Sequence, residues 1–481
     1  MSDIADELKK GLLEGKSLGE IKSSLVAKGF LSSDIEDKIN EVVMSKREDK
    51  KKEVSQVIKR FTIKELFDRI GYGFGSPQFV NILFAHTGAS YLLIGTLNGL
   101  KAVLSVLFSS FLEQAYKTRE ISRRLIGASG VLLGFSFIFM AMARFFNSVP
   151  FFTASLLLGT IGVVSYGDLY EKLTAGFKKE KRGYVLTKIS QFGLIIIGAS
   201  MLLGGYLMDK FPATGVRLTF ELFNKTFSFK LYGYLLAFEI SAIAFILSGY
   251  IISFIKERRP EESIVESGEK KEVIQSQFQT LKEHLGIFVK NRILLILLIA
   301  TTISGLAQTM GNAFYGIFIY RYLNNEGFGS FTNVAVIFII ALFASLISPY
   351  ITRKTSMAYG KFPMLAFGTV LMAIMPLTFY YNPNLLSISM GTLIGVIGAA
   401  ITGVAHGLLT LDIIPEKIRQ TYFGSFSLLI TIPFLITTPI FSYIGQVYGL
   451  KTLFLINGAM LILIVLPLYF LVVAMHRDVK I

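Results

Sequence analysis

The sequence predicts an all-α integral membrane protein with twelve transmembrane helices in two six-helix bundles, preceded by a small soluble helical module. Three observations predict this fold. No charged side chain lies between Phe362 and Ala405, a stretch interrupted once by Asn382-Pro383-Asn384. Of the 481 residues, 52% are hydrophobic and 17% are charged, whereas a soluble domain has about 25% charged residues. Finally, apolar runs long enough to cross a bilayer, which takes about 20 residues, recur from residue 69 onward.

Residues 1–45 predict the small cytoplasmic helical module. Ser17 with Glu20, and Ser33 with Glu36, fit the capping box that starts a helix. Apolar side chains at helical spacing would form its core: Leu12, Leu13, Ile21, Leu25, Ile35, Ile39 and Val43. The module is either a plain cytosolic cap or a docking or regulatory module. The pattern favours the cap, because short capped helices carry no chemistry of their own.

Residues 46–68 are basic and predict an amphipathic juxtamembrane segment. Val54, Val57, Ile58 and Phe61 recur at helical spacing among the lysines. Such a helix would turn its lysines toward anionic headgroups, although a solvated helix shows the same pattern.

Twelve apolar segments follow, six on each side of a long polar loop. The N-terminal bundle is expected over 69–255, the cytoplasmic central loop with an amphipathic helix over 256–291, the C-terminal bundle over 292–475, and a cytoplasmic tail over 476–481. The predicted spans are 69–86, 88–112, 124–144, 149–170, 184–208, 231–255, 292–320, 329–352, 362–381, 385–411, 419–445 and 450–475. The first is the most polar, which is typical of a helix that lines a polar cavity.

The net charge of +15 reflects Lys and Arg in alternate short loops. This placement follows the positive-inside rule and predicts a multi-pass protein of the plasma membrane with both termini in the cytoplasm. It also argues against nucleic acid as the partner, because the charge does not gather on one soluble face. Membrane lipids are the expected environment, and we expect a monomer.

Several kinds of chemistry lack their sequence signals. Without cysteine there is no disulfide, thiol catalysis or thiolate metal site. There is no phosphate-binding G-x-x-x-x-G-K-[ST] loop, and the four histidines are far apart. We therefore expect no cofactor and no metal, and a membrane-embedded enzyme or pump is the least favoured class.

The two halves repeat each other. Glu180-Lys181-Arg182 precedes the fifth span and Glu416-Lys417-Ile418-Arg419 the eleventh, and the separation of Arg182 from Arg419 along the chain is close to the half-length of the spanning region. With its six plus six spans, central loop and cytoplasmic termini, the chain resembles the major facilitator superfamily from Phe61 to Met475. Glycines along span five, at Gly193, Gly198, Gly204 and Gly205, also fit, because small residues let helices approach closely.

The resemblance implies a cytoplasmic gate, but the loop motifs depart from the family pattern. The segment Ser109–Thr118 keeps one acid and one base, Glu113 and Lys117, and lacks both family glycines. The gate candidates are Glu113, Lys117, Arg182 and Arg419. An ordinary solvated carboxylate is the alternative for Glu113.

Lys101 is the first candidate for the transport pathway, because it lies midway along span two, too far from either end for easy snorkelling. It could bind an anionic group or exchange a proton, and its alternative role is a structural pair with an acid. Polar residues on the cavity-lining spans that the family implies are Asn81, Asn98, Gln308, Asn312 and Tyr315. They could bind a solute or only pack helices together.

Three titratable residues complete the candidates. Asp168 is a proton carrier, a gate acid or an interfacial helix-end carboxylate. Glu239 lies inside span six, where an interhelical hydrogen bond or a protonated buried acid is the alternative to function. His406 could switch near neutral pH or stay neutral and bonded to the backbone.

The family resemblance and the repeat imply a secondary active transporter of a small solute that works by alternating access. Coupling to H⁺ or another ion is open. The alternative is a non-transporting membrane sensor or scaffold that acts through residues 1–45.

Overall fold

The computed structural model describes residues 18–28, 35, 56, 58–118, 123–175, 179–222, 225–254, 286, 291–414 and 426–479. The chain divides into two units, Met1–Ile63 and Lys64–Ile481. The central loop with its predicted amphipathic helix lies almost entirely outside the described residues, and so does Arg419.

The first unit contains the helix α2 (Leu18–Ala27). Ile21 and Leu25 lie one turn apart on one face of α2 and are buried, and Ile35 is buried as well. These three residues belong to the predicted core of the module. Its other predicted core and capping residues lie outside the described residues, except Glu20 on α2.

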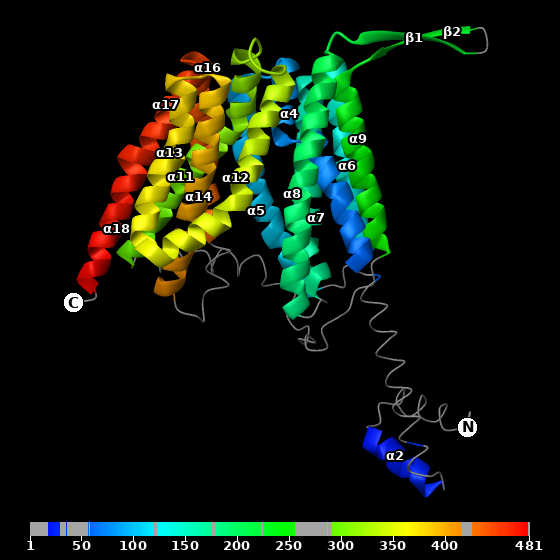
Figure 1. Cartoon of the computed structure of the whole chain (residues 1–481), viewed down its shortest axis with the longest axis vertical. Coiled ribbons are helices and arrows are strands. Elements are labelled where there is room, and N and C mark those ends of the chain that lie inside the picture. The colour runs from blue at the N-terminus through cyan, green and yellow to red at the C-terminus, as the bar shows by residue number, and fades with distance from the viewer. Residues whose placement is uncertain are drawn as a thin grey trace. The chain divides into compact units, whose positions relative to one another are not determined.

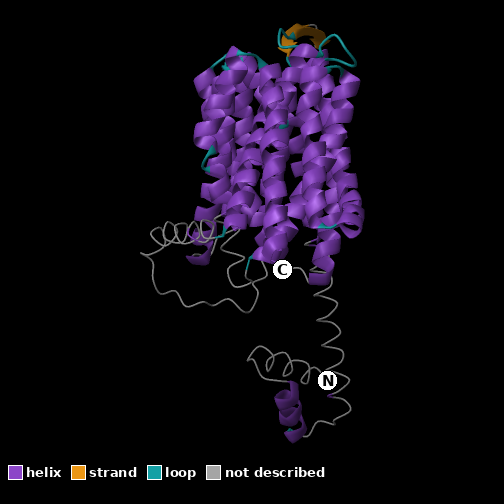
Figure 2. Ribbon diagram, turned by 90° about the vertical axis from the view of Figure 1, so that its left-hand side faces the viewer, coloured by secondary structure: helices purple, strands orange, loops and turns teal. Residues whose placement is uncertain are grey.

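The second unit consists of long helices in two groups (Figures 1 and 2). The first bundle holds the helical residues 64–74, followed by α4 (Pro77–His86), α5 (Tyr91–Thr118), α6 (Arg123–Phe145), α7 (Val149–Ala175), α8 (Lys179–Lys210) and α9 (Gly233–Ser253). The second bundle holds α11 (Arg292–Tyr322), α12 (Ser330–Tyr359), α13 (Lys361–Tyr381), α14 (Leu385–Ile413), α16 (Phe434–Val447), α17 (Leu450–Met460), the π-helical η2 (Leu461–Val465) and α18 (Leu466–Val479).

Ten of the described helices are long and apolar enough to cross a membrane, and Val149–Val164 is a shorter apolar stretch. The chain is therefore a multi-pass membrane protein. Ten of the twelve predicted spans correspond to these helices. The other two, 69–86 and 149–170, fall on the segment that ends in α4 and on α7.

The first predicted span is interrupted in the middle. Helical residues 58–74 end at Gly75, and α4 begins at Pro77. Ser76 caps α4 by accepting a hydrogen bond from the Phe79 N–H at 3.4 Å, and proline at the first helical position has no N–H to leave unpaired. Residues before position 69 are helical too, from residue 58 onward.

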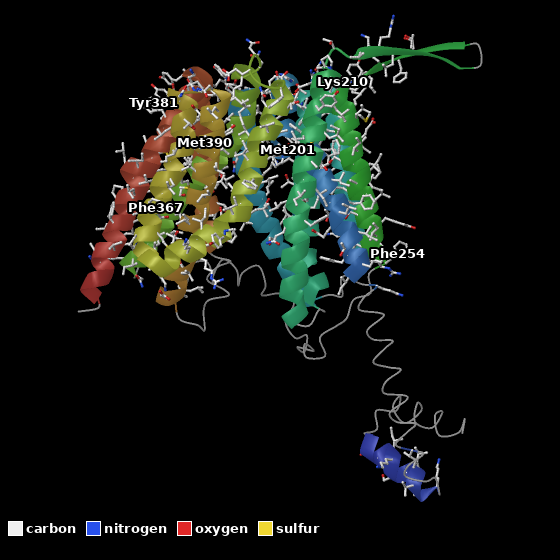
Figure 3. All side chains as sticks on the ribbon, viewed as in Figure 1. Met201, Lys210, Phe254, Phe367, Tyr381 and Met390 are labelled. Carbon is white, nitrogen blue, oxygen red and sulfur yellow. The ribbon has the colours of Figure 1, made fainter. Side chains whose placement is uncertain are left out.

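The described residues are almost entirely helical, as expected, and one short hairpin of two strands follows α8. Strands β1 (Val216–Leu222) and β2 (Lys225–Leu231) pair antiparallel, with Leu218 opposite Phe229. The residue alternation from Arg217 to Glu221 has the period of a strand. We call the end of the second unit that carries this hairpin the hairpin end, and the other the opposite end. Lys210 lies at the hairpin end and Phe254 at the opposite end (Figure 3).

Candidate functional site

Two predicted asparagines join the bundles. The Asn81 side chain on α4 is buried, and its Nδ2 donates to the Ala313 carbonyl of α11 at 3.2 Å. Asn98 on α5 donates from Nδ2 to Asn81 Oδ1 at 3.3 Å and to the Ile94 carbonyl at 2.8 Å. A chain of amide hydrogen bonds thus runs from α5 through α4 to the backbone of the second bundle.

Lys101 lies one turn beyond Asn98 on the same side of α5. It is partly buried, and it makes no hydrogen bond or ion pair within the described parts of the chain. The hydrogen bonds from Asn98 through Asn81 to Ala313 mark a common level on α5 and α11. From that level, α5 runs away from the hairpin end and α11 runs toward it, so the depths of their residues can be compared. Lys101 lies about 4.5 Å from the level of Asn98 toward the opposite end, and Gln308 lies about 7.5 Å from the level of Ala313 in the same direction. Lys101 and the polar part of α11 are therefore at similar depth.

The three predicted polar residues of α11 have different surroundings. Gln308 and Asn312 are exposed, and Gln308 Nε2 lies 3.3 Å from Met372 Sδ on α13. Tyr315 is instead buried, with its ring centroid 4.5 Å from that of Phe379 and 5.0 Å from that of Phe454. Tyr315 thus packs the second bundle, while Gln308 and Asn312 do not belong to its buried core.

His406 is anchored within the second bundle. Its Nε2 lies 2.9 Å from Thr301 Oγ1, and the Thr301 hydroxyl also contacts the Leu297 carbonyl at 2.8 Å. The imidazole stacks on Phe426 with ring centroids 5.6 Å apart. This setting matches a histidine that ties α14 to α11 and is only partly open to a solute.

A cluster of buried charges lies in helical residues 58–74, where the sequence predicted a headgroup-facing surface. Lys64 Nζ lies 2.7 Å from Glu65 Oε1 and 2.6 Å from Asp68 Oδ2. The exposed fraction is 2% for Lys64, 4% for Glu65 and 3% for Asp68. Ser248 on α9 donates to Asp68 Oδ1 at 2.5 Å, and Arg69 lies 3.2 Å from Glu65 Oε2. The sequence signal was available: two acids fall between two bases on one helical stripe.

Contacts between the bundles gather on one side. Among the described residues, every polar or aromatic contact between bundles falls in the half of the unit nearer the hairpin end. A Cβ on Gly95 would lie 1.6 Å from Ser442 Oγ, and one on Gly99 would lie 2.1 Å from Thr438 Oγ1, so α5 and α16 touch backbone to side chain. One hydrophobic core includes residues of both bundles, from Phe74 to Met460, whereas a second core, from Leu297 to Val472, belongs to the second bundle alone.

These features agree with comparisons to known proteins. The sequence pattern of the Major Facilitator Superfamily matches residues 65–405. The chain belongs to the major facilitator superfamily. Its membership confirms the resemblance that the sequence suggested, and it indicates a membrane transporter and not an enzyme. None of the curated proteins matches the chain closely enough to count as a relative.

Solved transporters of the superfamily share the fold at low sequence identity. The nucleoside transporter NupG is 12% identical with a TM-score of 0.65, over 88% of this chain and 99% of NupG. A structure of proton dependent oligopeptide transporters is 13% identical with a TM-score of 0.63, over 88% and 100%. A bacterial homolog of the human lysosomal transporter Spinster is 14% identical with a TM-score of 0.60, over 87% and 96%. At these identities the likeness establishes the fold alone.

The remaining predicted residues of this superfamily member lie elsewhere. Glu239 is exposed on α9 and is not brought together with the other candidates. Glu113 and Lys117 belong to α5, Asp168 to α7 and Arg182 to α8, so the first two lie in a helix and not in the expected loop. The side chains of these four lie outside the described residues, as does Arg419.

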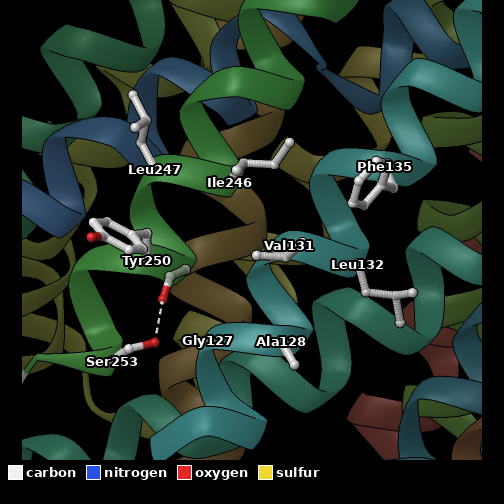
Figure 4. A pocket seen from close by; sticks show the side chains of 10 residues that line it. Gly127, Ala128, Val131, Leu132, Phe135, Ile246, Leu247, Tyr250 and Ser253 are labelled. Atoms are coloured by element: carbon white, nitrogen blue, oxygen red, sulfur yellow. Dashed lines mark hydrogen bonds between the residues drawn. The ribbon is translucent and has the colours of Figure 1, made fainter.

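A groove of about 490 Å³ lies on the surface of the first bundle between α6 and α9 (Figure 4). Its walls are apolar, and Phe135, Leu247 and Tyr250 are exposed beside it. Its one serine, Ser253, contacts the Gly249 carbonyl at 3.3 Å. A hydrophilic solute would find almost no polar partner there, so the polar region of α4, α5 and α11 is the better candidate for solute binding.

Proposed function

We propose that the chain is a secondary active transporter that moves a small solute by alternating access of its two bundles. The single observation that carries the proposal is the one-sided contact between the bundles. A shared core and direct hydrogen bonds join the hairpin-end halves, while the other half of the second bundle has a core of its own. Bundles whose contacts, among the described residues, lie on one side can rock about a central site.

The solute site lies, in this proposal, where Lys101, Asn98, Gln308 and Asn312 come to similar depth. An ammonium group inside a membrane span is costly unless an opposite charge or water reaches it. Since Lys101 has no partner among the described residues, a solute with an anionic group would supply one. Gln308 and Asn312 offer amide donors and acceptors for its neutral part.

The orientation follows from charge. The loops at the opposite end carry the Lys and Arg clusters, and the positive-inside rule assigns that end to the cytoplasm. The arrangement then corresponds to a transporter closed toward the outside, with both termini in the cytoplasm.

Proton coupling belongs to the proposal as well. Glu65 and Asp68 share the Lys64 ammonium in a buried site, and neutralising one acid would change that balance. Solved structures with a similar fold include proton dependent oligopeptide transporters and a nucleoside transporter. Organic solutes of that size with a carboxylate or phosphate are therefore the first to test.

Uptake into liposomes tests the proposal. Purified protein should accumulate at least one solute from a panel of carboxylates, peptides and nucleotides, and an inward proton gradient should increase uptake. Lys101→Gln should reduce uptake of an anionic solute at least tenfold, because the loss of a charged hydrogen bond costs about 1.5–3 kcal/mol. Lys354→Gln, which removes an exposed lysine of α12, is the matched control and should transport normally. Full activity of Lys101→Gln would remove Lys101 from the site.

A further inference from the structure

The start of α12 lacks a capping side chain of its own. The residue before the helix is Gly329, and an N-cap side chain normally accepts from the second and third helical N–H groups. Here Asp209, at the end of α8 in the other bundle, takes that place. Asp209 Oδ1 accepts from the Phe331 N–H at 2.9 Å, and Oδ2 accepts from the Thr332 N–H at 2.8 Å and the Thr332 hydroxyl at 2.7 Å.

The start of α5 receives a cap from the other bundle in the same way. The N–H of Leu92, the second residue of α5, donates to Gln446 Oε1 of α16 at 3.1 Å. Ser90 caps the next N–H, that of Leu93, from within the first bundle. Each bundle thus contributes one side chain to a helix start of its partner.

The two caps occupy equivalent positions of the internal repeat. Asp209 and Gln446 are separated along the chain by the same number of positions as Arg182 and Arg419. Gly205 and Ser442 have this separation too. Ser442 meets Gly95 of α5, and a Cβ on Gly205 would lie 2.9 Å from the Phe331 carbonyl oxygen of α12. The repeat therefore generates two matching contacts between the bundles.

The surroundings of Asp209 are built for this contact. Gly329 has φ +132°, and a Cβ there would lie 2.4 Å from Asp209 Oδ2, so a side chain would displace the carboxylate. Asn333 fixes the loop before α12 by donating to the carbonyls of Leu323 at 2.8 Å and Glu326 at 2.6 Å. The loop thus presents the N–H groups of α12 to the first bundle.

A cavity of about 230 Å³ lies beside this cap. Asp209 lines it together with His86, Tyr234 and Tyr320. Its lining is mixed, and its size together with these polar side chains leaves room for several water molecules. Water there would hydrate the carboxylate and the freed N–H groups once they separate, so the contact can break without leaving bare polar groups.

We infer that Asp209 and Gln446 are positioning residues that hold the hairpin end closed through reciprocal helix caps. The inference rests on the proposed alternating access. Asp209 is the stronger of the two, because its negative charge meets the positive end of α12 and accepts three hydrogen bonds. Gln446 is neutral and accepts one.

Thiol labelling tests this inference without any knowledge of the solute. The chain has no cysteine, so Ser442→Cys supplies a single reporter at a fully buried contact between the bundles. The reporter protein, in lipid nanodiscs, is treated with a charged maleimide. Asp209→Ala should raise the labelling rate about tenfold, since it removes the acceptor of three hydrogen bonds at the start of α12. Gln446→Ala should raise it about threefold, and the double variant by roughly the product.

Glu326→Gln is the matched control. Glu326 Oε2 also accepts from a helix start, the Leu385 N–H of α14 at 3.0 Å, but both residues belong to the second bundle. Labelling of this variant should stay at the reporter's own rate. If Asp209→Ala does not fold, Asp209→Asn, which keeps one acceptor oxygen, carries the test with a smaller rise. Unchanged labelling in the Asp209 variants, or an equal rise in Glu326→Gln, would overturn the inference, and neither outcome depends on whether solute transport has been found.

Discussion

At the scale of single residues, Lys64 is a charged side chain buried inside the first bundle. Its ammonium is buried and forms ion pairs with both Glu65 and Asp68. Removing it would take a buried cation away from these two carboxylates, and breaking a buried pair in this way costs about 3–5 kcal/mol. We expect Lys64→Met to lower the thermal unfolding midpoint of the detergent-solubilised protein markedly, as measured by intrinsic tyrosine fluorescence.

The pair of Lys361 and Asp412 is a natural control for that prediction. These two side chains also form an ion pair, but they are 37% and 52% exposed. Exposed pairs contribute about 0–1 kcal/mol, so Lys361→Met should leave the midpoint almost unchanged. Equal shifts in the two variants would contradict the view that burial sets the cost.

Single residues also show how far the site could be predicted from the sequence. Polar groups in an apolar span are conspicuous, so Asn81, Asn98 and Lys101 could be identified from the sequence. Asn98 does donate a hydrogen bond to Asn81 in the structure. Tyr315 could not be judged, because its spacing is the same whether the ring faces a solute or Phe379. Lys64 was assigned to the membrane surface, since a helix that faces headgroups and one that buries an ion cluster show similar charge patterns.

At the scale of elements, the contact of α5 with α16 depends on glycine. The Thr438 hydroxyl fills the space beside Gly99 and contacts the Phe434 carbonyl at 2.7 Å. A methyl group at residue 99 would overlap that oxygen, and crowding a packed contact costs about 1–3 kcal/mol. We expect Gly99→Ala to weaken closure of the hairpin end and to raise the labelling of Ser442→Cys several-fold, measured in nanodiscs.

Gly407 on α14 provides the comparison, because a Cβ there would meet no atom within 4 Å. Alanine is favoured over glycine in a helix by roughly 1 kcal/mol, so Gly407→Ala should fold at least as well and leave labelling unchanged. A rise in Gly407→Ala as large as in Gly99→Ala would show that labelling reports general loosening.

Elements also mark where prediction from sequence succeeds. Long apolar runs bounded by charged loops predicted α11 to α14 closely, because the bilayer leaves few alternatives to a helix. The strands β1 and β2 were missed, since they lie in a polar loop and their period of two is short. The break at Gly75 appeared in the sequence only as a lowered apolarity of the first span.

At the scale of the whole molecule, the internal repeat relates contacts between the bundles as well as sequence motifs. Arg182 and Arg419 revealed the offset between the two halves, and the same offset relates Asp209 to Gln446. What the sequence could not show is that these residues reach across to the other bundle, because contacts between α8 and α12 or between α5 and α16 join distant segments.

The division of the chain into two units leads to a final prediction about residues 1–45. Every described candidate for solute binding and for closure lies in Lys64–Ile481. If the chain is a transporter, deleting residues 1–45 should leave both the unfolding midpoint and the uptake of a transported solute near the values of the full chain. A sensor that acts through its N-terminal module would behave differently: the truncated chain would lose its function, while Lys101→Gln would keep it. Uptake by the full chain, the truncated chain and Lys101→Gln is measured in parallel. Uptake that survives the truncation but falls in Lys101→Gln supports the transporter, and no uptake by any of the three chains would favour the non-transporting sensor.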